Sequence, residues 1–294
     1  MGRATSKEGR YAVRKLLTLL ASLAAVAAVV ALPAGAIING QPDGERHRYV
    51  GLVTFYDTDG VYLWRCTGTL MSPTVFMTAG HCTEPPARSA QVWFDSGPID
   101  SGNYPLTPIE DRPPCTGYTG WPCTGGDATG IVHAHPDYDS SVFFLHDLGV
   151  VTWALPGVTG RGFGALPSEG ELSTLKKHAT FTSVGYGLQK SFPPSAASKD
   201  QDVKVRQFAT PKLVAIDDKK VGDFAILLSA NGNTGGTCFG DSGGPNFIGD
   251  SNVVGAVTSF GRTWTCRSPG GAYRVDQPDD LEWLATFGLG SGDS

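Results

Sequence analysis

Short runs of β-branched and aromatic residues recur along this chain between clusters of glycine, proline, asparagine and aspartate, and they limit the fold more than any other feature. Such runs are typical of strands, and the clusters between them are typical of turns. The 294 residues include 39 glycines and 20 prolines, and only 17% are charged, which argues against a helical bundle. About ten strands at this spacing favour a barrel or a sandwich. The predicted strands are residues 52–56, 75–78, 91–94, 142–145, 148–153, 179–186, 203–210, 225–229, 253–260 and 272–275.

Two segments depart from this pattern. Near the end, Pro278 and the two aspartates after it can form a first helical turn, apolar residues then recur at helical spacing, and Gly288 can end the helix. Residues 101–130 are rich in proline, glycine, threonine and cysteine and have no hydrophobic period, which predicts an irregular surface loop. No repeat or linker divides the remainder, so we expect one all-β domain over residues 37–294.

The first 36 residues have the pattern of a signal peptide. Five basic residues precede an uncharged apolar run from Leu16 to Leu32, and Ala34 and Ala36 then stand at small-x-small spacing before Ile37. The alternative is an uncleaved membrane anchor, because the apolar run lies near the lower limit for spanning a bilayer. We expect cleavage, secretion to the cell exterior and no stable membrane association of the mature protein.

The mature chain is acidic. Cleavage would remove five basic residues and one glutamate from totals of 23 and 28, which leaves a formal net charge of −9. Such a surface argues against nucleic acid and anionic membranes as partners. A net charge of this sign and size is also explained without any partner, because it keeps a protein soluble.

All six cysteines lie after the predicted signal peptide, and an even number in an oxidising compartment predicts disulfides. Zinc binding is the alternative, but no two cysteines have C-x-x-C spacing and no His-x-x-x-His pair accompanies them. We therefore expect no metal and no other cofactor. The cysteines are Cys66, Cys82, Cys115, Cys123, Cys238 and Cys266.

Ser242 lies in the segment TGGTCFGDSGGPNF and is the candidate nucleophile. A serine hydroxyl needs a base to take its proton and donors to stabilise the oxyanion that forms at the substrate carbonyl. Gly240 would let its own N–H and that of Ser242 point at one spot, which predicts an oxyanion hole. The alternative is an ordinary glycine-rich turn.

His81 is the candidate base, in the segment VFMTAGHC at the end of a predicted strand. A buried structural histidine is the ordinary alternative for any single position. However, TAGHC and GDSGGP in this order resemble the chymotrypsin-like serine protease family, in its secreted, bacterial type. The family also has an acid between the two motifs, and HDLGVV supplies Asp147 at the head of an apolar strand. Asp137 and Asp139 compete for this role but lie in a turn-like stretch.

The resemblance implies an all-β fold of two six-stranded antiparallel β-barrels with the active site between them and a short C-terminal helix. It divides the chain into a signal peptide, residues 1–36, and a protease domain of two barrel subdomains, residues 37–294. It implies a serine endopeptidase that hydrolyses peptide bonds through a Ser-His-Asp triad and an acyl-enzyme intermediate. The triad consists of His81, Asp147 and Ser242.

The segment IING, residues 37–40, is similar to the mature amino terminus of this family. The resemblance implies that a new ammonium group on Ile37 pairs with Asp241 and that this buried pair shapes the oxyanion hole. A buried pair that loses one partner typically costs about 3–5 kcal/mol. Because the predicted signal cleavage falls directly before Ile37, we expect signal removal itself to activate the enzyme.

The resemblance also implies two disulfides, Cys66–Cys82 and Cys238–Cys266. Cys115 and Cys123 remain, and their spacing would close a small ring in the long loop. This third bridge departs from the family's common set. Its loop either borders the substrate cleft or only decorates the surface.

A primary specificity pocket is expected from the positions that match the family's substrate-binding strands. Gly236 would form its base with Thr237 beside it, and Gly261 and Gly271 would leave room on the walls. No acid stands at the base, so the pocket predicts apolar or aromatic residues before the scissile bond rather than Lys or Arg. The predicted substrate-binding residues are Gly236, Thr237, Ser259, Phe260, Gly261 and Gly271.

The main alternative function is a non-catalytic binding protein on the same fold, because a fold does not determine a function. Such proteins usually lose a triad residue, the oxyanion glycine or the new amino terminus, and this chain retains all of them. The expected partners are protein or peptide substrates and protein protease inhibitors, and the expected state is a monomer.

Overall fold

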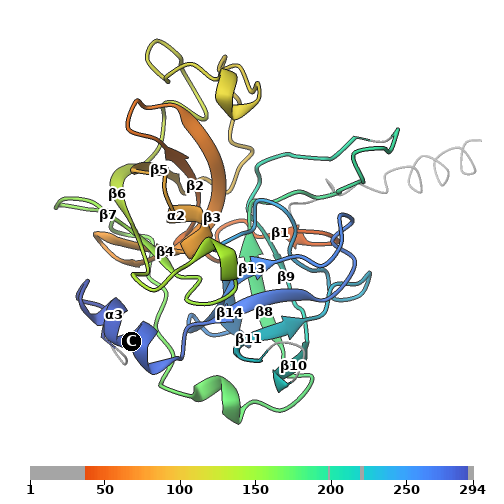
Figure 1. The fold of residues 1–294 in the computed structure, drawn as a ribbon. Helices are drawn as coiled ribbons and strands as arrows, with labels where there is room; N and C mark the ends of the chain where they lie inside the picture. Colours follow the sequence, from red (N-terminus) through yellow and green to blue (C-terminus); the bar gives the residue numbers. More distant parts are fainter. Residues whose placement is uncertain (1–36, 198, 219–221, 291–294) are drawn as a thin grey trace, which may run out of the picture. The chain divides into compact units, whose positions relative to one another are not determined.

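The computed structural model describes residues 37–197, 199–218 and 222–290. The predicted signal peptide, residues 1–36, lies outside the described residues. The described part is mostly β and contains a closed barrel, a second sheet and a short C-terminal helix (Figure 1). This arrangement confirms the predicted fold class. None of the helices formed by the described residues is long and apolar enough to cross a membrane.

The closed barrel contains six strands in the order β2-β3-β4-β7-β6-β5, and each neighbouring pair is antiparallel. Its interior is filled by alternating apolar side chains such as Val53, Phe55 and Phe76, which are all buried. The strands are β2 (Val50–Tyr56), β3 (Tyr62–Ser72), β4 (Val75–Thr78), β5 (Ser89–Trp93), β6 (Ala128–Ala134) and β7 (Gly149–Thr152).

The second sheet has eight antiparallel strands in the order β1-β9-β8-β12-β13-β14-β11-β10, rather than the six that the resemblance implied. One addition is the short strand β1, which pairs with β9 at one edge. The strands are β1 (Gln41–Pro42), β8 (Phe181–Gly185), β9 (Gln207–Ala209), β10 (Leu213–Asp218), β11 (Gly222–Leu228), β12 (Pro245–Ile248), β13 (Val254–Phe260) and β14 (Gly270–Arg274).

The helical segments are short. Helix α3 (Pro278–Ala285) begins at the predicted proline, which suits the first turn because that turn needs no proline N–H, and it ends before Gly288. The strand predicted at residues 142–145 is wrong. The 3₁₀ helix η2 (Ser140–Val142) stands at its start, because Asp139 accepts a capping hydrogen bond from the Ser141 N–H at 2.8 Å. The other helical segments are α2 (Gly80–Thr83), η1 (Ile109–Asp111) and η3 (Glu171–Thr174).

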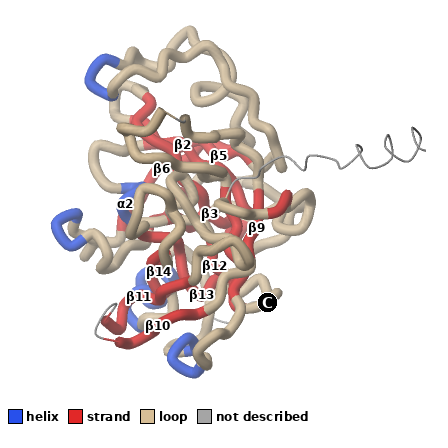
Figure 2. The backbone as a smooth tube through the Cα atoms, turned by 90° about the vertical axis from the view of Figure 1, so that its right-hand side faces the viewer, coloured by secondary structure: helices blue, strands red, loops and turns tan. Residues whose placement is uncertain are grey.

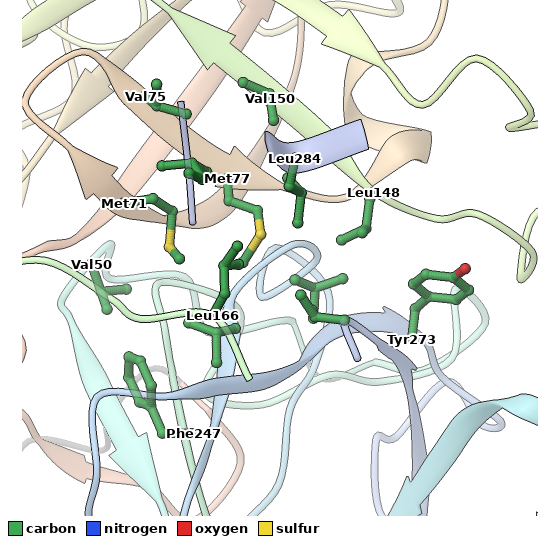
Figure 3. Close-up of a cluster of buried hydrophobic side chains, with 14 of the residues drawn as sticks. Val50, Met71, Val75, Met77, Leu148, Val150, Leu166, Phe247, Tyr273 and Leu284 are labelled. Carbon is green, nitrogen blue, oxygen red and sulfur yellow. The ribbon is translucent and has the colours of Figure 1, made fainter. Parts of the chain in front are cut away.

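One hydrophobic cluster joins the barrel, the second sheet and α3 (Figure 3). Met77 and Leu148 come from the barrel side, Phe247 and Tyr273 from the second sheet, and Leu284 from α3. Leu148 is the residue before β7, so this packing holds the start of that strand firmly in the core. The segment directly before Leu148 is thereby positioned against both sheets.

The long loop before β6 has a packed interior of its own. It lies beyond β2 and β5 (yellow in Figure 1; Figure 2) and contains η1. Tyr104 and Trp121 are buried and pack against Tyr62 of β3, with ring centroids 6.0 and 5.6 Å from that of Tyr62. Apart from η1, the backbone is irregular up to residue 127, as predicted. The aromatic side chains of this loop nevertheless form a small core.

Candidate active site

His81 and Asp147 meet where two paired strands end. Thr78, the last residue of β4, pairs with Gly149, the first of β7, so the residues after β4 and before β7 are neighbours. Helix α2 carries His81, whose Nδ1 lies 3.0 Å from both carboxylate oxygens of Asp147. The His81 backbone N–H also donates to Asp147 Oδ1 at 2.8 Å. Asp147 is fully buried, and its contact with Nδ1 leaves Nε2 as the nitrogen that can accept a proton.

A third donor completes the surroundings of Asp147. The Ser259 hydroxyl, from β13 of the second sheet, donates to Asp147 Oδ2 at 2.5 Å. Three donors thus hold one carboxylate, two from His81 on α2 and one from Ser259 on the second sheet. The sequence analysis named Ser259 only as a substrate-binding residue; its contact with Asp147 depends on the docking of the two sheets.

The charge of Asp147 changes the titration of His81. Burial lowers the pKa of His81, but the negative charge of Asp147 and its hydrogen bond outweigh this effect, so the pKa is raised above its ordinary value of 6.5. The pair is therefore arranged to stabilise an imidazolium. The competing acids lie in other contacts, since Asp139 caps η2 and Asp137 donates its N–H to His135.

Ser242 lies on a loop that packs against the residues before His81. Gly243 adopts a φ of 74°, and a Cβ atom there would lie 2.0 Å from Thr78 Oγ1 and 2.6 Å from the Ala79 nitrogen. Only glycine allows this approach. Among the described residues, Ser242 has no hydrogen bond to His81. The structure therefore brings His81 and Asp147 into direct contact and brings the loop of Ser242 against the end of β4.

In the loop of Ser242, two carbonyl groups accept hydrogen bonds from Thr67, and two N–H groups stay free among the described residues. Thr67 donates its hydroxyl to the Gly240 carbonyl at 2.9 Å and its N–H to the Ser242 carbonyl at 2.8 Å. The N–H groups of Gly240 and Ser242 donate to no acceptor in the described part of the chain, and Gly240 has a φ of 94°. Two free N–H groups separated by one residue can bind an oxyanion. Thr67 was missed from sequence, where its only signal is its place directly after Cys66.

Asp241 is fully buried beside these groups. It accepts hydrogen bonds from the backbone N–H groups of Gly187 at 2.7 Å and Cys238 at 2.8 Å. Burial nevertheless raises the pKa of Asp241 to about 7. Ile37, the residue expected to pair with it, is also fully buried, and the next residue, Ile38, exchanges two backbone hydrogen bonds with Gly236. In this chain the Ile37 nitrogen belongs to a peptide bond, and no ion pair joins it to Asp241 within the described residues.

A cavity of about 220 Å³ adjoins Ser242, and it differs from the predicted pocket at two residues. Gly236 faces Ala230, since an added Cβ would lie 2.4 Å from the Ala230 Cβ. The ring of Phe260 covers Gly271, where an added Cβ would lie 2.1 Å from the Phe260 Cζ. Gly236 and Gly271 therefore do not line the cavity. The lining residues are Thr237, Cys238, Phe239, Ser242, Thr258, Ser259, Phe260, Gly261 and Cys266, none of which carries a charge.

The described residues form three disulfides, and two of them lie at this site. The six cysteines form the bridges Cys66–Cys82, Cys115–Cys123 and Cys238–Cys266. The first ties β3 to the helix of His81, and the third borders the cavity beside Ser242. The second closes a ring within the long loop.

A closed antiparallel barrel and a second sheet that share a histidine, a buried aspartate and a glycine-rich serine loop define the class of chymotrypsin-like folds. The family model described as "Trypsin" matches residues 124–281, more than half of the chain, so the protein belongs to the trypsin family. None of the curated proteins compared with this sequence matches it.

Solved structures agree with this fold. An "HL collagenase" has a TM-score of 0.61 and 20% sequence identity, over 86% of this chain and 98% of that one. Human heparin binding protein has a TM-score of 0.57 and 19% identity, over 88% of this chain and 100% of that one. A double mutant of the same protein has a TM-score of 0.58 and 16% identity. At these identities the similarity shows the fold alone. One of these structures is named as a collagenase and the other as a binding protein, so the shared fold does not determine the function.

Proposed function

We propose that the protein is a secreted serine endopeptidase with Ser242 as nucleophile, His81 as general base and Asp147 as the acid that orients it. The observation that carries this proposal is the buried Asp147, which holds His81 Nδ1 at 3.0 Å while the N–H groups of Gly240 and Ser242 remain free. Three disulfides suit an oxidising exterior. Protein or peptide substrates and protein inhibitors are the corresponding partners.

In the first chemical step, His81 Nε2 takes the proton of Ser242 as the hydroxyl oxygen attacks the substrate carbonyl carbon. Asp147 holds the ring in the required tautomer and stabilises the imidazolium, as the raised pKa of His81 supports. The N–H groups of Gly240 and Ser242 stabilise the oxyanion. His81 then protonates the leaving amine, and an acyl-enzyme remains. A water molecule activated by His81 hydrolyses this ester.

The cavity beside Ser242 would take the side chain before the scissile bond. Phe260 and the Cys238–Cys266 bridge offer apolar surface, and Thr237 and Thr258 add polar edges. Because no charged residue lines the cavity, we expect apolar or aromatic side chains to be preferred over Lys or Arg. Peptides that differ only at this position test the preference, and faster cleavage after Arg than after Leu or Phe would contradict it.

Activation would depend on a cut before Ile37. The cut creates an ammonium group on a residue that is already buried, and its charge would compensate the buried carboxylate of Asp241. If signal peptidase makes this cut, no separate propeptide is needed. Sequencing the first residue of the active secreted protein tests the idea, and a start at any residue other than Ile37 would contradict it.

A serine-directed fluorophosphonate tests the activity itself. We expect covalent modification of the secreted protein at Ser242, located by peptide mass spectrometry, and no modification of a Ser242→Ala variant. The alternative is a non-catalytic binding protein, a possibility raised by the similarity to human heparin binding protein. A correctly cleaved protein that neither reacts nor hydrolyses peptides would favour this alternative.

A further inference from the structure

Two histidines and an aspartate converge behind the turn that carries Asp147. His135 directly follows β6, His146 directly precedes Asp147, and Asp280 lies in the first turn of α3. The Asp280 Oδ1 atom is 3.6 Å from His135 Nε2 and 3.9 Å from His146 Nδ1. All three atoms lie within 4.8 Å of one another.

None of these three atoms has a hydrogen-bond partner in the described part of the chain, although each is buried. Their separations exceed the range of hydrogen bonds. A buried polar atom without a partner typically costs about 1–3 kcal/mol. Only seven buried side-chain atoms among the described residues lack a partner, and three of them lie within 4.8 Å of one another, which indicates a missing ligand there.

The three atoms match the ligands that a divalent transition metal prefers. Imidazole nitrogen and carboxylate oxygen are common ligands of zinc, and where the protein supplies only three ligands a water molecule takes the fourth position. A tetrahedral ion with bonds of about 2.0–2.2 Å holds its ligand atoms about 3.3–3.6 Å apart. The observed separations of 3.6 and 3.9 Å are close to this range, but the His135 and His146 rings are stacked with centroids 4.9 Å apart, so a ring must turn before both nitrogens can bind one ion. Asp279 Oδ2 lies 3.4 Å from His146 Nδ1, which is within the separation of two ligands of one ion.

Neighbouring contacts orient the cluster. The Tyr273 hydroxyl donates to Asp280 Oδ2 at 2.7 Å and so turns Oδ1 toward the histidines. Trp283 packs edge-on against the His135 ring at 4.8 Å. The His146 side chain is 29% exposed, which gives an ion a path from solvent. Metal binding would break one hydrogen bond, the one that the Asp137 N–H donates to His135 Nδ1 at 3.2 Å. A histidine that binds a metal through Nε2 carries its proton on Nδ1, and this nitrogen then cannot accept a hydrogen bond.

We propose that His135 Nε2, His146 Nδ1 and Asp280 Oδ1 bind a divalent transition-metal ion, with Zn²⁺ the best match, and that the ion ties α3 to the turn that presents Asp147. This turn is tight, since His146 has a φ of 48° and its carbonyl accepts the Leu148 N–H at 2.7 Å. The proposal departs from the expectation of no metal, and it does not depend on peptidase activity. Leu284 and Leu148 belong to one hydrophobic cluster, so α3 and this turn are already docked (Figure 3).

The test uses the untagged secreted protein, stripped with a chelator and titrated with Zn²⁺ and with Co²⁺. We expect one ion per chain by calorimetry and the visible absorption of four-coordinate Co²⁺. At a free Zn²⁺ concentration of about one hundred times Kd, the Tm should rise by roughly 5–10 °C. Chelator should reverse both changes.

Two matched variants assign the site. His146 and His178 both have a positive φ, 48° and 70°, and asparagine tolerates this conformation. His146→Asn should abolish the Co²⁺ absorption and the Tm shift, whereas His178→Asn should retain them. Asp280→Asn should also lose binding. The Co²⁺ titration of the unmodified protein decides the question even if a variant folds poorly. Absence of saturable binding, or unchanged binding by His146→Asn, would overturn the proposal.

Discussion

Asp147 and Asp241 are both fully buried carboxylates next to the serine loop, yet their surroundings differ. Asp147 accepts three hydrogen bonds from two residues, His81 and Ser259, and one of these residues can carry a positive charge. Asp241 accepts two hydrogen bonds from backbone N–H groups, and burial still raises its pKa to about 7. The fold alone completes the first site. Under the proposed activation, a cut before Ile37 would supply a cation to the second.

If the proposed activation is correct, this difference explains how the chain can hold His81 and Asp147 in contact and still be inactive before processing. His81 on α2 and Ser259 on the second sheet reach Asp147 once the chain folds, so no covalent change is required. Asp241 is hydrogen-bonded by backbone N–H groups, and these bonds together with the charge of Arg65 do not offset its burial. The four predictions below test this contrast.

The largest effect is expected for Asp147→Asn. An asparagine here would favour the wrong tautomer of His81 and could not stabilise its charge, so kcat should fall about 10⁴-fold, the factor established for serine proteases of this fold. Hydrolysis of a chromogenic peptide by the cleaved protein measures it. His146→Asn, one residue away, is the control and should change kcat by less than about 3-fold in metal-free buffer. Equal losses in both variants would contradict the role of Asp147.

The second prediction concerns the uncleaved chain with Ser242→Ala, which cannot digest itself. Folded Asp241 keeps its proton up to about pH 7, whereas an ordinary aspartate loses it near 3.8. The folded state therefore binds more protons between these pH values, and its stability should fall as the pH rises from about 4 to 8. The full effect is of the order of 4 kcal/mol. Urea unfolding at several pH values measures it.

Asp241→Asn in the same background provides the comparison. Its pH dependence of stability should be flatter over this range, because no charge forms at the buried position. The cleaved protein with a free Ile37 should also be flatter, since its ammonium group compensates the carboxylate. Identical slopes in all three proteins would count against the proposed role of Asp241.

A smaller effect is expected for Ser259→Ala, which removes one donor from Asp147. A hydrogen bond to a charged group contributes about 1.5–3 kcal/mol, so kcat should fall roughly 10–100-fold. Thr237→Val, which changes the same cavity without touching Asp147, should alter KM more than kcat. If Ser259→Ala changes only KM, its hydroxyl serves the substrate rather than Asp147.

The smallest effect is a shift in the titration of His81. Attack requires the neutral ring, so kcat/KM should fall as the pH drops through the pKa of His81, which lies above 6.5. In Asp147→Asn the burial remains while the attraction is lost, so the pKa should fall below 6.5. Proton NMR of the His81 ring measures both values. An unchanged midpoint would show that Asp147 does not control this titration.

Several features could be found from sequence because they are local. The segments around His81 and Ser242 are continuous, and Pro278 marks the start of α3. The missed strand β3 shows the limit of such patterns. It contains Gly68 and several polar residues, and such residues are also common in turns. In the structure the backbone at Gly68 packs closely against Phe76, because an added Cβ there would lie 2.4 Å from the Phe76 ring. Glycine is needed there for close packing inside the barrel.

Other features depend on residues that are distant along the chain. Ser259 reaches Asp147 across 112 positions, and Phe260 covers Gly271 only because β13 and β14 are paired. The cluster of His135, His146 and Asp280 forms because α3 packs against the turn before β7. No spacing rule links these residues, so the sequence predicted no metal site.

The amino-acid sequence by itself determined the mostly β class, the C-terminal helix and the segments that hold the candidate catalytic residues, because turn formers, apolar periods and short motifs act over a few residues. The tertiary structure alone decided which buried carboxylate is fully hydrogen-bonded, which glycines line the cavity and where three unpartnered ligand atoms meet. Burial and long-range docking set these properties, since they determine which charges and donors lose water and which partners replace it.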